Sequence, residues 1–117
     1  MNTADIMYMS PHTPPPDVEL NVELDTLYCD MSQLTEIPPY PKLRILSCDY
    51  NLVRVLPPFK ALRRLSCVEN RLTKLPPYPE LTRLDCSDNQ ITELPPYPEL
   101  TKLDCSYNQI LELPPYP

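Results

Sequence analysis

The sequence predicts a β-solenoid, with a parallel β-sheet on one face, extended polyproline-like segments on the other and little or no helix. Three observations predict it. The five cysteines are spaced nineteen residues apart, at positions 29, 48, 67, 86 and 105. Apolar and polar residues alternate just before each cysteine, and a Pro-Pro dipeptide follows nine or ten residues after it.

A nineteen-residue unit runs through residues 18–112 as five copies, and residues 113–117 begin a partial sixth. Its pattern is L-x-x-L-x-C-x-x-N-x-L-x-x-L-P-P-Y-P-x. In the fourth copy, Leu84 and Cys86 flank the polar Asp85. Such a period of two is typical of a short strand with one buried face. Repetition at a fixed interval then stacks the strands in parallel, about 4.8 Å apart.

The Pro-Pro-Tyr-Pro segment forms the return path of each predicted coil. Proline fixes φ near about −65° and lacks an N–H, so it is excluded from an inner sheet ladder or a helix interior. It suits an extended polyproline II conformation. We expect the aromatic residues of these segments to stack as a ladder, with rings inward and hydroxyls toward solvent. They are Tyr40, Phe59, Tyr78, Tyr97 and Tyr116.

Two further columns are expected inside the coil. Asn51, Asn70, Asn89 and Asn108 should turn inward and bond main-chain groups, which cost about 1–3 kcal/mol each when buried without a partner. The cysteines come one per coil, whereas zinc ligands usually come as close pairs, so we interpret them as small buried apolar residues. No metal and no cofactor are predicted. The absence of glycine predicts few residues with positive φ.

Composition argues against several classes of function. Ten Lys and Arg stand against sixteen Asp and Glu, a net charge of −6, which disfavours a nucleic acid or an anionic membrane as partner. No apolar run is long enough to cross a bilayer. No signal peptide or N-glycosylation sequon is recognised, and five cysteines cannot pair completely within one chain. We therefore expect a cytoplasmic, reducing location, either in the cell of origin or in a host cell.

No constellation of residues indicates an enzyme. His12, the single histidine, lies in a Pro-rich N-terminal arm or cap, residues 1–17, ahead of the repeat domain, residues 18–117. We interpret Asp85 and Asp104 as partners of nearby basic residues in solvated charge pairs, rather than as a catalytic acid–base pair. A role of the arm as a P-x-x-P ligand for SH3-like domains stays open as an alternative.

The unit resembles the leucine-rich repeat, whose signature is L-x-x-L-x-L-x-x-N-x-L, with cysteine here in place of the third leucine. The resemblance implies a right-handed coil with its sheet on the concave face. The L-P-P-Y-P segment is similar to short repeats of bacterial effectors and of large DNA viruses, which implies action inside a host cell. This unit is one residue shorter than the usual effector repeat, and Tyr stands in place of Leu. The ligase activity of some effectors is not carried over, because no such domain is recognisable here.

The outward strand positions are the predicted binding site. The core positions barely change from copy to copy, whereas the outward positions vary, and Tyr and Arg are frequent in protein interfaces. We predict a module that binds a protein partner on its concave sheet face; a merely soluble face is the other interpretation. The predicted binding residues are Tyr50, Arg64, Arg83, Asp85, Lys102, Asp104 and Tyr107.

The alternative function is that of a structural, self-assembling protein. The last coil is expected to leave an open core and an unpaired strand edge. Two chains related by a two-fold axis would bury these ends, with their last strands antiparallel. The predicted homodimer edge consists of Leu103, Asp104, Cys105, Ser106, Leu113 and Tyr116.

Overall fold

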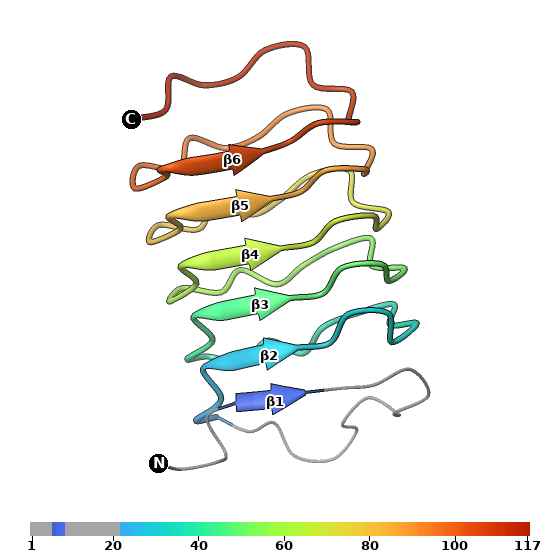
Figure 1. The fold of residues 1–117 in the computed structure, drawn as a ribbon. Coiled ribbons are helices and arrows are strands. Elements are labelled where there is room, and N and C mark those ends of the chain that lie inside the picture. Colours follow the sequence, from blue (N-terminus) through green and yellow to red (C-terminus); the bar gives the residue numbers. More distant parts are fainter. Residues whose placement is uncertain (1–5, 9–21) are drawn as a thin grey trace.

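A computed structural model describes residues 6–8 and 22–117 as a parallel-stranded coil. Six strands form one sheet in sequence order, with neighbours parallel, and Figure 1 shows them as a stack of arrows pointing the same way. The described residues contain no helix, so the predicted β-solenoid is confirmed. The strands are β1 (Ile6–Tyr8), β2 (Thr26–Tyr28), β3 (Ile45–Ser47), β4 (Arg64–Ser66), β5 (Arg83–Asp85) and β6 (Lys102–Asp104).

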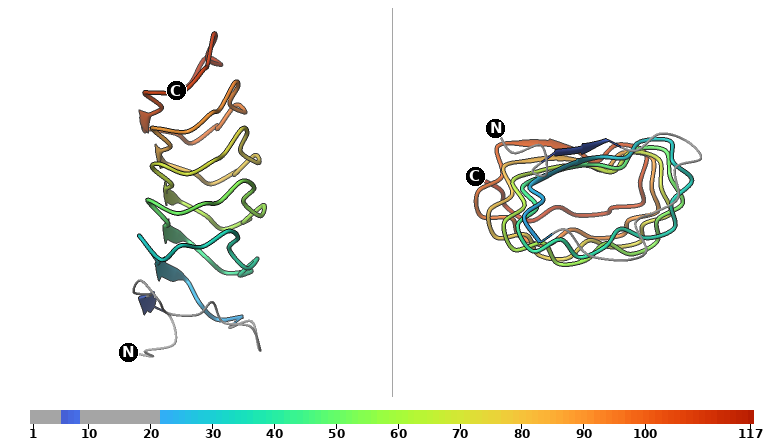
Figure 2. Two further views of the ribbon diagram at one scale, coloured as in Figure 1. Left: turned by 90° about the vertical axis from the view of Figure 1, so that its right-hand side faces the viewer. Right: turned by 90° about the horizontal axis from the view of Figure 1, so that it is seen from below.

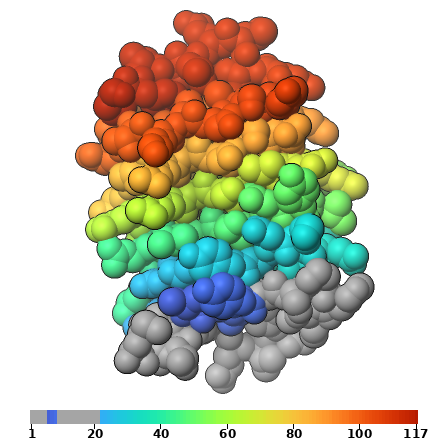
Figure 3. Space-filling view, viewed as in Figure 1, coloured from blue at the N-terminus to red at the C-terminus, as the bar shows by residue number. Residues whose placement is uncertain are grey.

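Each coil leaves the sheet, returns through its Pro-rich segment and enters the next strand. Seen along the stack, the coils overlie one another as closed loops, with the strands on one side and the return segments opposite (Figure 2). In the space-filling view the coils form successive bands of colour (Figure 3). Neighbours in space are therefore neighbours in sequence, as in other repeat proteins.

The strand register follows the repeat. From β2 to β6 the paired residues are nineteen apart, as in Leu46 with Leu65. Because side chains alternate between the two faces of a strand, this register sends the central leucines inward and their neighbours outward. Four of the cysteines are fully buried and all five are free, which confirms the predicted apolar column.

The asparagine column bonds successive coils together, as predicted. Asn70 lies at its centre: its Nδ2 donates to the carbonyls of Cys48 (2.9 Å) and Cys67 (3.2 Å), and its Oδ1 accepts from the N–H of Val53 (3.0 Å). Among the described residues, no buried side-chain nitrogen or oxygen lacks a partner. The carboxamides thus satisfy main-chain groups of loops that no strand reaches.

The expectation of few residues with positive φ was wrong. One residue per coil, directly before the asparagine position, adopts the left-handed conformation, and Gln33 does so as well. This turn lets the chain leave the strand while its N–H still bonds the next coil, as from Tyr50 to the carbonyl of Val68 (2.8 Å). A residue with a Cβ pays about 1–2 kcal/mol for it. The five turn residues are Met31, Tyr50, Glu69, Asp88 and Tyr107.

An aromatic ladder lies on the return side. Ring centroids are 6.3 Å apart from Phe59 to Tyr78 and 6.2 Å apart at the next two steps. The expected orientation of the hydroxyls was wrong, because they point to the preceding coil. There the Tyr78 hydroxyl donates to the carbonyl of Pro57 at 3.0 Å. The hydroxyls of Tyr97 and Tyr116 each make the equivalent bond to the coil before their own. The Pro57 carbonyl also accepts from the N–H of Phe59 in its own coil (3.1 Å). The tyrosine hydroxyl is therefore a second donor, which reaches it from the following coil and joins the two coils.

Removal of one such hydroxyl should therefore weaken the fold. Tyr78 is fully buried, and Tyr78→Phe leaves the Pro57 carbonyl without this donor. We expect the free energy of unfolding to fall by about 1–2 kcal/mol in urea titrations. The control is Tyr107→Phe, whose ring is exposed and whose substitution should change stability by less than about 0.5 kcal/mol. Equal stability of Tyr78→Phe and the unaltered protein would contradict this role.

Candidate protein-binding face

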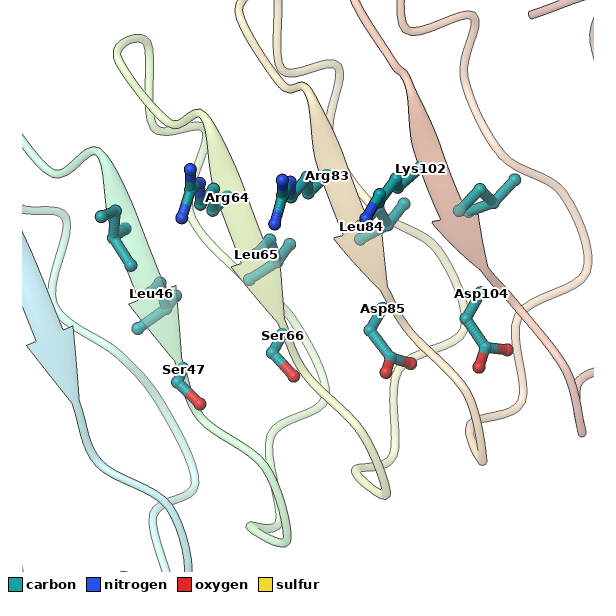
Figure 4. A pocket seen from close by; sticks show the side chains of 12 residues that line it. Leu46, Ser47, Arg64, Leu65, Ser66, Arg83, Leu84, Asp85, Lys102 and Asp104 are labelled. Atoms are coloured by element: carbon teal, nitrogen blue, oxygen red, sulfur yellow. The ribbon is translucent and has the colours of Figure 1, made fainter.

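A shallow hollow of about 630 Å³ lies over the outward side of β3, β4, β5 and β6. Figure 4 shows the side chains that line it. Each strand contributes its first and third residues to this face, because residues two apart point the same way. We call the outward residues of these four strands the recognition face.

The recognition face carries a basic column and an acidic column. The basic column is Arg64, Arg83 and Lys102, at the first positions of β4, β5 and β6; all three are exposed. The acidic column is Asp85 and Asp104, at the last positions of β5 and β6. In Figure 4 the two columns run side by side across the strands, at opposite ends of them.

Like charges stand directly opposite one another within each column. Arg83 pairs in register with both Arg64 and Lys102, and Asp85 pairs with Asp104. Such pairs are destabilising by fractions of a kcal/mol. The predicted charge pairs were wrong, since the one ion pair among the described residues is Lys42–Glu23. The physical reason is the register, which keeps opposite charges at opposite ends of the strands.

Serine side chains fix the acidic column in place. The Asp104 carboxylate accepts from the Ser106 hydroxyl (2.6 Å) and from the Ser106 N–H (3.1 Å), and Asp85 binds Ser87 in the same way. These two bonds from Ser106 lower the pKa of Asp104 below its ordinary value. Asp49, in an earlier coil, titrates differently from Asp104, because burial raises the pKa of its carboxyl group. Serine bonds therefore hold both carboxylates of the acidic column in one orientation, and the lowered pKa keeps Asp104 ionised at neutral pH.

Five of the seven predicted binding residues meet at this hollow, and the two tyrosines do not. Tyr50 and Tyr107 lie in the left-handed turns beyond the strands, where they are 54% and 79% exposed. Neither lines the hollow. Tyr107 instead borders a second hollow, of about 390 Å³, at the C-terminal end of the coil.

The N-terminal part of the sheet adds residues that the repeat did not reveal. β1 joins the sheet by pairing with β2 at an offset of twenty residues, one more than the repeat. The rings of Tyr8 and Tyr28 stack there with centroids 4.9 Å apart. The I-M-Y of residues 6–8 matches the T-L-Y of β2 in pattern, which is the signal that could have found this strand. The outward side of the sheet thus changes from aromatic at β1 and β2 to charged at β4, β5 and β6.

The predicted dimer edge lies together at the end of the coil. β6 is the last strand of the sheet and has one free edge. Leu113 and its neighbour Leu111 are 45% and 99% exposed, while Leu103, Cys105 and Tyr116 are half-buried against the core. One face of the Tyr116 ring packs on Tyr97. Asp104 and Ser106 are exposed beside this apolar end.

Other predicted features are only partly covered by the structure. Within residues 6–8 and 22–117, no three His, Cys, Asp or Glu side chains are grouped so that they could hold a metal ion. The same residues form no helix of sufficient length and apolarity to cross a membrane. His12, the P-x-x-P segment of residues 10–16 and the boundary between residues 1–17 and 18–117 lie outside the described residues.

Comparison with known families agrees with this geometry. A family profile described as leucine-rich repeats in two copies matches residues 60–99 and, one repeat later, residues 79–117. The same nineteen-residue register extends through the rest of the described coil, back to β2. The chain belongs to the leucine-rich repeat family. Members of this family are generally protein-interaction modules, and their solenoids are typically non-catalytic scaffolds. No curated protein sequence gives a significant match to the chain.

Proposed function

We propose that this protein binds a protein partner through the recognition face and has no catalytic activity. The observation that carries the proposal is the direct register of like charges: three cations in one column and two carboxylates in the next. Packing does not require these residues, because they point outward. Their mutual repulsion costs stability, and a partner of complementary charge relieves that cost when it binds.

The arrangement favours a protein over a polyanion. The two columns lie two residues apart along the strand, about 7 Å, so a partner must present charges of both signs at that spacing. A nucleic acid would match the basic column but would also face Asp85 and Asp104. Because serine bonds already orient these carboxylates, binding orders few additional side chains.

Arg83→Glu tests this proposal through two opposite effects. We expect it to raise the free energy of unfolding by up to about 1 kcal/mol, because it replaces two like-charge neighbours by two opposite-charge neighbours. We expect the same change to abolish capture of the partner. Urea titration measures the first effect, and quantitative affinity capture from the natural cellular source measures the second.

The matched control is Arg54→Glu, an exposed arginine in a turn away from the recognition face. It makes the same change of charge and should leave capture unchanged. Equal capture by the unaltered protein, Arg83→Glu and Arg54→Glu would overturn binding at the recognition face. A loss of stability in Arg83→Glu would show that the arginine column serves the fold.

End-to-end self-assembly is the second candidate function. It is favoured by the apolar last coil, where Leu111 and Leu113 are exposed and a hollow of about 390 Å³ lies open beside them. Large apolar side chains exposed together commonly mark an interaction site. The solution mass, measured by light scattering over a range of concentrations, tests this candidate: a mass of one chain at all concentrations would contradict it.

We also propose that the protein works in a reducing compartment. Its five cysteines are free, and four of them are fully buried. Their Cβ atoms project in parallel from neighbouring coils, a poor geometry for disulfides. Thiol alkylation in intact cells, followed by mass spectrometry of the denatured protein, should find all five cysteines reduced.

A further inference from the structure

We propose that β6 pairs with β6 of a second copy, antiparallel about a two-fold axis at Leu103, so that Lys102 of each copy faces Asp104 of the other. This inference rests on the self-assembly candidate above and names its register. It makes the free edge of the sheet a specific, self-complementary interface.

The main chain of β6 is already arranged for such a pair. Alternate residues of a strand bond to opposite neighbours. The Lys102 N–H donates back to Thr82 (3.1 Å), and the Asp104 carbonyl accepts from Cys86 (2.8 Å). The N–H and carbonyl of Leu103 therefore face the free edge. Two antiparallel strands centred on Leu103 would exchange both of these hydrogen bonds, N–H to carbonyl in each direction.

Further donors of the last coil point the same way. In the coil before it, the N–H groups of Cys86 and Asp88 donate to carbonyls of the following coil, at 2.8 and 3.0 Å. The corresponding groups of the last coil are the N–H groups of Cys105 and Tyr107, and neither donates to a main-chain carbonyl within residues 6–8 and 22–117. In the antiparallel register, the Cys105 N–H lies opposite the Thr101 carbonyl of the second copy.

Charge selects this register over its neighbours. Opposed residues in an antiparallel pair point to the same face, so an axis that set Lys102 against Leu103 would place an outward residue opposite an inward one. An axis at Lys102 or at Asp104 would set like charges against each other. An axis at Leu103 instead forms two Lys102–Asp104 pairs. No carboxylate of the described chain lies within 4.0 Å of the Lys102 ammonium, so it is available to the second copy.

The apolar end meets its own equivalent in the same arrangement. The two-fold axis turns the last coil of one copy against that of the other, and the exposed Leu111 and Leu113 lie on this end. Leu103, Cys105 and Ile110, which are half-buried against the core, lie there too. An isologous contact of this kind closes at two copies, whereas head-to-tail stacking would continue as a fibre.

Charge exchange at two positions tests the register. We expect the unaltered chain to be a dimer by light scattering and sedimentation velocity, and Lys102→Asp and Asp104→Lys to weaken dimerisation at least about tenfold each, because each turns two attractive pairs into repulsive ones. The double exchange should restore the dimer. An equimolar mixture of the two single variants should form a heterodimer. The control is Lys74→Asp, an exposed lysine outside β6, which should dimerise like the unaltered chain.

The outcomes separate this inference from the candidate on which it rests. A monomer at all concentrations, in the unaltered chain, overturns both. A dimer that neither single variant weakens overturns the register but leaves self-assembly in place. A dimer that both variants weaken, but that neither the double exchange nor the mixture restores, overturns the Lys102–Asp104 pairing.

Discussion

Asn70→Ala is expected to destabilise the protein by about 3 kcal/mol or more. The carboxamide of Asn70 is buried and joins two coils: it accepts from Val53 and donates to the carbonyls of Cys48 and Cys67. Alanine removes all of these bonds together, and each main-chain group left without a partner costs about 1–3 kcal/mol. In a stack where each coil contacts only its neighbours, a break at the centre also uncouples the two halves.

Urea titration followed by circular dichroism measures this loss. Asn108→Ala is the matched control, because Asn108 makes the same kinds of bond in the half-buried last coil, where water can replace them. We expect it to lose less than half as much stability. A loss below about 1 kcal/mol for Asn70→Ala would contradict the role assigned to the asparagine column.

Raising the pH from 8 to 11 is expected to unfold the protein. Burial raises the pKa of Cys29 and Cys86 from 9.0 to about 12, and it raises the pKa of Cys48 and Cys67 well above 9.0. Above pH 9 the unfolded chain therefore loses these protons while the folded chain keeps them. Stability falls as the pH rises, by about 1.4 kcal/mol per pH unit for each thiol.

The combined effect is large because the thiols repeat. At pH 11 the four buried thiols together lower the free energy of unfolding by about 10 kcal/mol, which is comparable with the whole stability of a domain this size. The loss begins near pH 9 and continues to about pH 12, the pKa of Cys29 and Cys86 in the folded chain. Burial also raises the pKa of Tyr78 and Tyr97, which adds to the loss above pH 10.

The free energy of unfolding, measured by urea titration at several pH values between 8 and 10, tests this dependence. A double variant, Cys48→Ala with Cys67→Ala, keeps two of the four buried thiols. It should be less stable at pH 7, but its stability should fall with pH at about half the slope of the unaltered protein between pH 9 and 10. Identical slopes would show that the cysteine column does not cause the alkaline unfolding.

The repeat allowed most of the fold to be predicted from the sequence. A fixed interval of nineteen residues requires equivalent residues to stack, so the leucine, cysteine and asparagine columns followed directly. The direction of the Tyr78 hydroxyl did not, because it depends on where the Pro57 carbonyl of the preceding coil points, which the repeat pattern does not specify. The positive φ before each asparagine was missed since residues with side chains occupy a conformation that glycine usually takes.

The candidate site was predictable in its residues but less so in its geometry. The outward positions of the strands followed from alternation, and five of the predicted residues line the hollow. The like-charge columns depend on direct register, which sets Arg83 against Arg64 and Lys102 rather than against a carboxylate. β1 was not found as a strand, because its offset of twenty residues departs from the repeat.

The charged columns of the recognition face stay aligned only if the asparagine column holds the coils in register. Native-state hydrogen exchange tests this most directly. The N–H groups of Val53, Leu72 and Ile91 lie in loops outside the strands and donate to asparagine carboxamides at 3.0, 3.0 and 2.9 Å. We predict that the amides of Val53 and Leu72, which are fully buried, exchange only through global unfolding, as slowly as the amides of β4. Exchange of these two amides at the rate of exposed loops would show that the coils are not joined in this way.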